Sequence, residues 1–331
     1  MKALVTGGGG FLGGVIVRML RERGDQVRSF SRAEHPALSS CGVEQIRGDL
    51  GDKAAVTAAA KGCDVIFHVA AKAGIWGAYD AFYQSNVSGT EHVLEACRAN
   101  GIRKLIYTSS PSVVFDGQDV EGGDESIPYP SRYEACYPET KALAEQLVLA
   151  AASPALATVA LRPHLIWGPG DNHLVPRIVA KGRAGKLRRI GVSTNLVDTV
   201  YVDNAARAHL QAADCLSPDG VLSGKAYFIS NGQPLPLWDM VNRILSAAEV
   251  PPVCRSISPQ LAYAAGCICE GLWGLLRLSG EPPMTRFVAH ELASAHWFSI
   301  EAARRDFGYQ PEISIEEGLL RLRQWFLAGS P

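Results

Sequence analysis

The chain has 331 residues, of which 47% are hydrophobic and 20% are charged, a balance that excludes a disordered or fibrous protein. Lys and Arg total 32 against 33 for Asp and Glu, so the net charge of -1 provides no basic field and disfavours nucleic-acid binding. The length favours one large domain with a smaller part beside it.

In chain order, short apolar runs alternate with helical patterns over residues 1–165. This alternation predicts a doubly wound parallel sheet, because helices that cover both faces of a sheet require near-continuous apolar strands. The predicted strands are 3–6, 27–30, 65–67, 105–107, 158–161 and, later, 227–229. The predicted helices include 12–23, 237–248, one that begins near 259, and 313–326.

Two features bear on location. Met1 leads directly into the first predicted strand, so we expect no signal or transit peptide and a cytoplasmic protein. The stretch Leu261 to Leu278 is apolar, but Glu270 lies within it, so we predict no integral membrane span and a pocket wall or peripheral contact instead. The eight cysteines show no paired CxxC spacing and predict reduced, mostly buried thiols, and we expect no metal site.

A glycine-rich turn follows the first predicted strand. Gly7, Gly10 and Gly13 come directly after Thr6 and before a helical pattern that ends at Gly24. Strand, turn and helix in this order predict a dinucleotide site, because glycine lets the backbone approach a pyrophosphate and the helix start directs free N–H groups at it. A flexible loop is the alternative interpretation.

The second predicted strand ends in Ser29-Phe-Ser-Arg32, where an NAD enzyme usually places an Asp or Glu. Arginine donates charge-assisted hydrogen bonds to phosphate oxygens, so Ser31 and Arg32 favour NADP(H) as the cofactor. An ordinary exposed arginine on a turn is the alternative.

Tyr137 and Lys141 are four residues apart, so a helix that begins near Pro138 places both on one face. A free phenol has a pKa near ~10, and a neighbouring cation is the simplest means of making it exchange protons at neutral pH. We predict that Ser110 holds a carbonyl oxygen, Tyr137 acts as general acid, and Lys141 tunes Tyr137 and holds the nicotinamide ribose. Ser109 and Ser112 are alternatives to Ser110.

The joint order of these motifs resembles the extended short-chain dehydrogenases of the 3β-hydroxysteroid dehydrogenase-like group. Within that group, the segment His68–Gly77 and the tail Trp297–Gly318 are similar to the 2-alkyl-3-oxoalkanoate reductases of bacterial long-chain olefin biosynthesis. The matching pieces are Thr6–Gly13, Gly48–Leu50, His68–Ala71, Asn86–Thr90, Tyr107–Ser110, Tyr137–Lys141, Leu161–Pro163, Ile166–Asp171 and Tyr201–Asn204.

The resemblance implies that NADPH reduces the ketone of a long-chain 2-alkyl-3-oxoalkanoic acid. Asp49 would then meet the adenine, Ala70 and Ala71 would line the cofactor path, and residues 163–166 would lie along the nicotinamide. The full set of expected cofactor contacts is Thr6, Gly7, Gly9, Gly10, Phe11, Leu12, Ser31, Arg32, Asp49, Leu50, Val69, Ala70, Ala71, Lys72, Asn86, Thr108, Tyr137, Lys141, Pro163, Leu165 and Ile166.

The expected organisation is an α/β protein with an NADP-binding Rossmann domain at residues 1–168, onto which segments near 196–230 and 300–312 pack back. Residues 169–195 and 231–331 would form a smaller, mainly helical substrate-binding part. The resemblance also implies a homodimer and association with other enzymes of the olefin pathway.

Such a substrate needs an apolar channel and a cation for its carboxylate. The stretch around Trp273 is a candidate for the channel, although a plain buried helix explains it equally well. Candidates for the cation are Lys72, Arg132, Arg177 and Arg188, while His164 and His173 flank a glycine-proline loop and could touch substrate.

Two other functions stay open. A 3β-hydroxysteroid or sterol dehydrogenase would share the same cofactor motifs, because these say little about the ligand. A non-catalytic NADP-sensing regulator is disfavoured, since a sensor has no use for Ser110, Tyr137 and Lys141.

Overall fold

The structure is a computed structural model that describes residues 1–191 and 194–329. Residues 192–193 and 330–331, which the sequence assigns to the substrate-binding part, lie outside the described residues.

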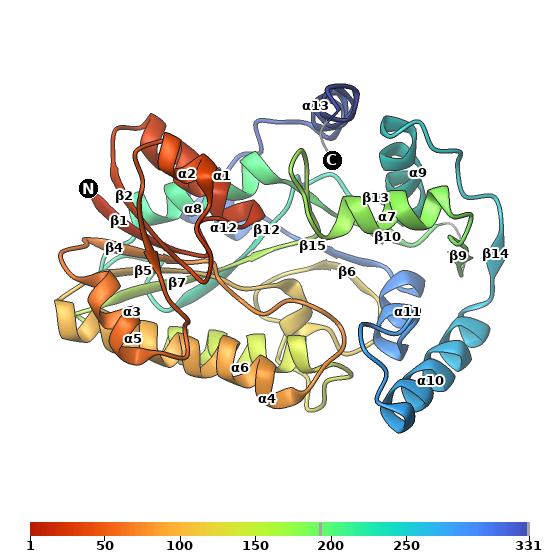
Figure 1. Ribbon diagram of the computed structural model, residues 1–331, viewed down its shortest axis with the longest axis horizontal. Helices are drawn as coiled ribbons and strands as arrows, with labels where there is room; N and C mark the ends of the chain where they lie inside the picture. The colour runs from red at the N-terminus through yellow and green to blue at the C-terminus, as the bar shows by residue number, and fades with distance from the viewer. Residues whose placement is uncertain (192–193, 330–331) are drawn as a thin grey trace.

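A seven-stranded parallel sheet forms the centre of the molecule, in the order β12-β7-β5-β4-β1-β2-β3 (Figure 1). All six predicted strands are confirmed. The sequence missed the edge strand β3, whose four residues include a single apolar side chain, Ile46. The bounds are β1 Lys2–Thr6, β2 Gln26–Ser31, β3 Glu44–Arg47, β4 Val65–His68, β5 Lys104–Thr108, β7 Ala157–Pro163 and β12 Lys225–Ile229.

Helices cover both faces of this sheet, as the doubly wound prediction requires (Figure 1). One face carries α1, α8 and α12, and the other carries α3, α5 and α6. The apolar sides of these helices are buried against the strands, for example Ile16 and Leu20 of α1 and Val93 of α5. Their bounds are α1 Phe11–Glu22, α3 Lys53–Ala60, α5 Gly89–Asn100, α6 Cys136–Ala150, α8 Val202–Cys215 and α12 Glu301–Phe307.

A second, four-stranded sheet has the order β13-β10-β15-β6 and joins segments that are far apart in the chain. Its strands are too short for periodicity to reveal them, and the sequence did not predict them. They are β6 Val120–Gly123, β10 Leu196–Val197, β13 Leu235–Pro236 and β15 His296–Phe298. Two further pairs are β8 Ile166–Trp167 with β11 Val200–Tyr201, and β9 Arg189–Ile190 with β14 Ser256–Ile257.

The predicted helices of the C-terminal half are confirmed as α9 Leu237–Ala247, α10 Pro259–Leu276 and α13 Ile315–Leu327. Across the described ranges, no helix has both the length and the apolar character needed to cross a membrane. The remaining helices are α2 Pro36–Ser40, α4 Tyr79–Tyr83, the π-helix η1 Gln84–Ser88, the 3-10 helix η2 Pro111–Val114, α7 Leu174–Arg183 and α11 Arg286–Ala293.

The prediction of mostly buried cysteines is wrong. Cys63, which follows α3, and Cys97, within α5, are buried, but half of the eight are exposed. Cys41 and Cys254 lie in surface loops, and Cys267 is on the outward face of α10, so apolar neighbours in sequence did not imply burial.

One continuous hydrophobic core runs from the central sheet into the second half of the chain. It includes Ile16 of α1, Ala205 of α8, and Trp238 and Ile244 of α9. The two parts that the sequence distinguishes therefore share buried side chains, and the division at residue 168 remains a proposal about function.

Candidate active site

The glycine turn between β1 and α1 has the geometry of a phosphate cradle. Gly7 has φ +69°, and its N–H donates to the Phe30 carbonyl over 2.8 Å. A Cβ on Gly13 would lie 2.2 Å from the Gly7 carbonyl oxygen, so the turn can close against the helix because that residue is glycine. The N-cap residue Gly10 provides no side-chain cap, which leaves the first turn of α1 open to a ligand anion.

The end of β2 lies beside this turn. Ser31 is partly buried, with its hydroxyl donating to the Ala33 carbonyl over 2.8 Å, and Arg32 is exposed. The imidazole of His35 rests on Gly9, where a Cβ would come within 2.1 Å of its Nε2 atom. Gln45 of β3 fixes His35 by accepting from its N–H over 2.9 Å. The sequence did not single out His35, because nothing in its spacing links it to the glycine turn.

Asp49 and Leu50 follow β3. Asp49 is exposed, and its carboxylate accepts from the Gly51 N–H over 2.8 Å. Leu50 is buried, and a Cβ on Gly89 would lie 2.8 Å from its side chain. Asp49 therefore presents a carboxylate at the same edge of the sheet as Arg32, while Leu50 packs beneath it.

The segment after β4 runs along the glycine turn. The Thr6 hydroxyl accepts from the N–H groups of Val69 and Ala70 over 3.1 and 3.2 Å. A Cβ on Gly7 would lie 3.0 Å from the Cα atom of Ala70, so the two backbones are in close contact. Ala71 is exposed just beyond them.

Asn86 ties this segment to the helix that carries Tyr137. Its side chain accepts from the Lys72 N–H over 2.7 Å and donates to the Lys72 carbonyl over 3.1 Å and to the Thr140 hydroxyl over 3.0 Å. Asn86 is 2% exposed and lies in the π-helix η1. Its hydrogen bonds hold the segment after β4, at Lys72, against Thr140 of α6.

Helix α6 begins at Cys136, two residues before the predicted start, and places Tyr137 and Lys141 in its first two turns. Lys141 is 2% exposed and donates to the Thr108 carbonyl over 2.5 Å, with its ammonium 4.1 Å from the centre of the Tyr107 ring. Burial lowers the pKa of Lys141 to about 7, and the Glu145 carboxylate opposes that shift.

Tyr137 faces Ser110 across the end of β5. Burial raises the pKa of Tyr137 to about 12, an interaction with the Ser110 side chain lowers it, and the Glu291 carboxylate raises it. Burial rather than an adjacent cation therefore dominates the pKa of Tyr137, and the tuning of Tyr137 by Lys141 stays a prediction.

The structure also distinguishes the three serines. Ser109 is 4% exposed with its hydroxyl buried, whereas Ser110 is partly exposed and its hydroxyl shares a hydrogen bond of 2.9 Å with that of Ser112. This arrangement supports Ser110 as the side chain available to a ligand.

A buried polar chain lies behind the end of β7. His164 is hydrogen-bonded to Asp198 through Nδ1 and to His296 through Nε2, the latter over 3.2 Å. His296 in turn bonds the Glu291 carbonyl over 2.9 Å, and its pKa is lowered to about 4 by burial and by His164. Both ring nitrogens of His164 are thus hydrogen-bonded to buried side chains. His173, by contrast, is exposed at the start of α7.

Three cofactor-path residues follow β7 directly. Pro163 ends the strand and pairs with Ile229 of β12, Leu165 has the unusual φ of +42°, and Ile166 is partly buried. A non-glycine residue in this backbone region is uncommon, and such residues cluster at ligand sites.

The sequence missed Glu291, which the structure brings beside Tyr137 from the far end of the chain. Glu291 lies in α11, and burial raises the pKa of its carboxyl group to about 7. A lone glutamate in an amphipathic helix carries no signal by which the sequence could have identified it.

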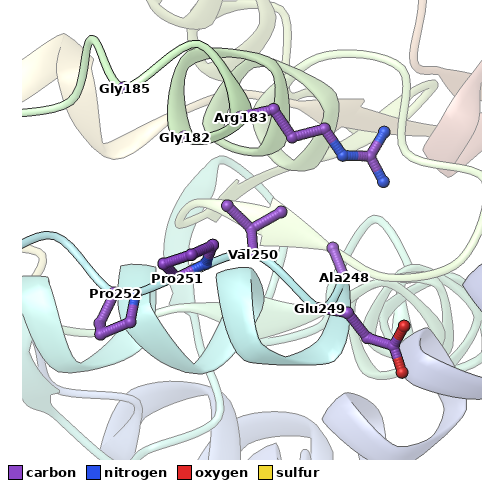
Figure 2. A pocket seen from close by; sticks show the side chains of 8 residues that line it. All are labelled: Gly182, Arg183, Gly185, Ala248, Glu249, Val250, Pro251 and Pro252. Carbon is purple, nitrogen blue, oxygen red and sulfur yellow. The ribbon is translucent and has the colours of Figure 1, made fainter.

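A cavity of about 650 Å³ lies elsewhere, between the end of α7 and the loop after α9 (Figure 2). Figure 2 shows Arg183 and Glu249 on opposite sides of it, and none of the predicted site residues lines it. Within the part of the chain that the structure describes, no three His, Cys, Asp or Glu side chains group as metal ligands would.

A doubly wound parallel sheet, an open helix start after its first strand, and a partly exposed tyrosine with a buried lysine at the carboxyl edge define an oxidoreductase of the short-chain dehydrogenase type. A solved structure described as MoeE5 in complex with UDP-glucose and NAD shares this fold, with a TM-score of 0.76 at 23% identity over 100% of both chains.

Residues 4–253 match the 3-beta hydroxysteroid dehydrogenase/isomerase family, and the chain belongs to that family. A 2-alkyl-3-oxoalkanoate reductase of Stenotrophomonas maltophilia is 56% identical, over 98% of each chain. A decarboxylating sterol-4-alpha-carboxylate 3-dehydrogenase of Mus musculus is 37% identical, over 98% of this chain and 91% of the mouse protein.

Proposed function

We propose that the protein reduces the ketone of a long-chain 2-alkyl-3-oxoalkanoic acid to the 2-alkyl-3-hydroxyalkanoic acid, as a step of long-chain olefin biosynthesis. The observation that carries this proposal is the 56% identity, over nearly full length, to a protein named for that reduction. The grouping of Ser110, Tyr137 and Lys141 supports the same chemistry.

The bound nicotinamide would supply a hydride to the ketone carbon. Residues of the chain bind and protonate the carbonyl oxygen. The Ser110 hydroxyl donates a hydrogen bond to the carbonyl oxygen, and the Tyr137 phenol transfers its proton to that oxygen as the hydride arrives. A pKa of about 12 keeps Tyr137 protonated at neutral pH, so that it begins each turnover as an acid. The sum is ketone, NADPH and one proton converted to alcohol and NADP⁺.

The residues around the glycine turn fit a dinucleotide, and we assign NADPH rather than NADH to them. The uncapped start of α1 at Phe11 and Leu12 would bind the pyrophosphate. The exposed Arg32 would bind the 2′-phosphate, with His35 beside it on Gly9.

Lys72 is the best-placed partner for the substrate carboxylate. It is partly buried, its backbone N–H is hydrogen-bonded to Asn86, and its ammonium is 5.1 Å from the centre of the Phe82 ring. By contrast, Arg177 is paired with Glu281 at 2.7 Å, and Arg188 donates to the carbonyls of its own loop. Arg132 is exposed.

The proposal retains residues 1–168 as the NADP-binding domain, with 169–195 and 231–331 as the substrate-binding part. It also retains a cytoplasmic homodimer that associates with other enzymes of the olefin pathway. The location and these partners stay predictions.

A sterol dehydrogenase is the second candidate, because the mouse sterol-4-alpha-carboxylate enzyme is 37% identical over nearly the whole chain. The oxidation of a 3-hydroxyl group would use Ser110, Tyr137 and Lys141 in the reverse direction.

The experiment that separates the two candidates measures NADPH consumption by the purified protein. We expect turnover with a long-chain 2-alkyl-3-oxoalkanoic acid and little with 3-ketosteroids, tested alongside 3β-hydroxysteroid oxidation with NAD⁺ and NADP⁺. A preference for steroid would reassign the substrate, and inactivity on every substrate with intact NADPH binding would favour a sensor.

A further inference from the structure

The carboxylate of Glu281 lies in a site that has the donors of a carboxylate-binding site. One of its oxygens accepts from the backbone N–H of Ile75 over 3.3 Å, and the other is 2.7 Å from the guanidinium of Arg177. An arginine and a backbone N–H suit an acidic ligand, because a carboxylate accepts hydrogen bonds on both oxygens and those from a charged donor are the strongest. The position of Glu281 therefore marks where the carboxylate of a ligand would bind if Glu281 withdrew.

Three segments that are distant in the chain meet at this carboxylate. Arg177 lies in α7, Ile75 in the segment after β4, and Glu281 in the loop that joins α10 to α11. Gly74 has φ +126°, and a Cβ there would lie 3.0 Å from a Glu281 carboxylate oxygen. The backbone can approach the carboxylate this closely because residue 74 is glycine.

The segment that Glu281 contacts borders the candidate active site. Lys72, three residues before Ile75, is the residue to which the substrate carboxylate is assigned. Beyond Ile75, the Gly77 carbonyl oxygen is 4.0 Å from the thiol sulfur of Cys136, which directly precedes Tyr137 in α6. A ligand held by the Ile75 N–H would therefore lie at the approach to the reaction centre.

Glu281 can leave this site at little cost. Its side chain is 29% exposed and that of Arg177 is 52% exposed, so water screens the ion pair and its net contribution to stability is small. Glu281 follows Gly280, which has φ +80°, and both lie between two helices. The exchange of one carboxylate for another keeps Arg177 and the Ile75 N–H paired, while the displaced Glu281 gains hydration.

We propose that Arg177 and the Ile75 N–H form a carboxylate-binding site at which an incoming long-chain carboxylic acid displaces Glu281. The acid is held there before its carboxylate moves along the segment to Lys72. A neutral ketone of the same size has no group that replaces Glu281, so the site favours keto acids over neutral ketones. The substrate role of this site rests on the proposed function, whereas the binding of a carboxylate does not.

The test is calorimetric titration of the full-length, NADPH-saturated protein with decanoate and with decanol, which share a chain length and differ in the head group. We expect Arg177→Gln to weaken decanoate binding about tenfold relative to decanol, because a charge-assisted bond is lost. Glu281→Gln should strengthen it about threefold, because a neutral amide competes less well for Arg177. The control is Arg183→Gln, which removes the same charge from an exposed position of α7 and should leave the ratio unchanged.

The double variant separates displacement from a general change of charge. If Glu281 competes for Arg177, Glu281→Gln should give no gain in the Arg177→Gln background, whereas a general electrostatic effect would give the same gain in both backgrounds. Additive effects would overturn the proposal, as would a decanoate-to-decanol ratio that Arg177→Gln leaves unaltered.

Turnover tests whether the site serves the substrate. Arg177→Gln should lower kcat/KM for a 2-alkyl-3-oxo acid about tenfold relative to its methyl ester, through KM rather than kcat, because the site acts before the reaction. An equal change for acid and ester would overturn the substrate role. If wild type does not reduce the keto acid although decanoate binding depends on Arg177, the proposed function fails and the carboxylate site stands.

Discussion

Reduced solvation sets the protonation of the ionisable groups at the candidate site, where Lys141 is buried and Tyr137 and Glu291 are partly buried. Lys141 and Glu291 carry opposite charges in water, yet burial brings the pKa of each to about 7. The pKa of Tyr137 shifts away from neutral pH, from 10 to about 12. The site therefore combines a phenol that stays protonated at neutral pH with two groups, Lys141 and Glu291, whose pKa values are about 7.

Tyr137→Phe should bind NADPH as the wild type does, yet lower kcat about 10²–10⁴-fold, because the proton donor to the carbonyl oxygen is lost. Fluorescence titration measures the binding, and NADPH oxidation measures the turnover. Tyr83→Phe removes a hydroxyl from a surface tyrosine and should leave both unchanged. Full activity in Tyr137→Phe would remove the phenol from the mechanism.

Glu291→Gln should stabilise the protein at high pH. The carboxyl pKa rises on folding from 4.5 to about 7, so the folded state binds more protons than the unfolded state between these values, and stability falls as pH rises through this window. The variant lacks that loss, so its unfolding free energy should exceed that of wild type by about 1–3 kcal/mol at pH 8 and match it below pH 4.5. Urea unfolding across this range measures the difference.

The same substitution has a kinetic readout. Glu291 contributes to the raised pKa of Tyr137, so its neutral replacement should move the alkaline limb of the pH–kcat profile to lower pH. An unchanged profile together with unchanged stability would show that Glu291 does not influence the pKa of Tyr137.

At the scale of elements, α6 must hold Tyr137 and Lys141 in register with β5. A buried ion pair fixes it to the neighbouring strand β7, where Arg162 donates to Glu145 over 2.6 Å with both side chains almost fully buried. Tyr129 donates to the same carboxylate over 2.6 Å. The pair orients the helix, although buried pairs of this kind add little net stability.

Arg162→Met should destabilise the fold by about 3–5 kcal/mol, because Glu145 is left charged and unpaired in the interior. Adding Glu145→Met should restore most of that loss. Urea unfolding of the single and double variants measures both effects, and equal loss in the two proteins would contradict the ion-pair explanation.

The turn after β2 is the element that should select the cofactor. Arg32→Asp should shift the ratio of kcat/KM for NADPH over NADH towards NADH by about 10–100-fold, since a charge-assisted bond to the 2′-phosphate is replaced by repulsion. Arg323→Asp makes the same charge change on the exposed face of α13 and should leave the ratio unchanged. An unaltered ratio in Arg32→Asp would refute the assignment of the ribose site.

At the scale of the whole molecule, the sequence predicted what depends on local pattern. The parallel strands are strongly apolar, and the order of strand, glycine turn and helix is contiguous, so both could be recognised directly. Glu291, His296 and Asp198 reach the site through α11 and the small sheet, whose two- and three-residue strands leave no periodic signal. The apolar stretch around α10 was identified, but whether it faces a pocket or solvent depends on tertiary packing.

The small sheet has a consequence for biosynthesis. The N–H of Ala295, just before β15, donates to the carboxylate of Asp119, just before β6, although the two residues are 176 apart in the chain, and the two strands then pair in parallel. A nascent chain cannot complete this pairing until residue 298 has left the ribosome. The small sheet therefore closes only after nearly the whole chain has been synthesised, later than the pairing of β1, β2 and β4 in the N-terminal part of the chain.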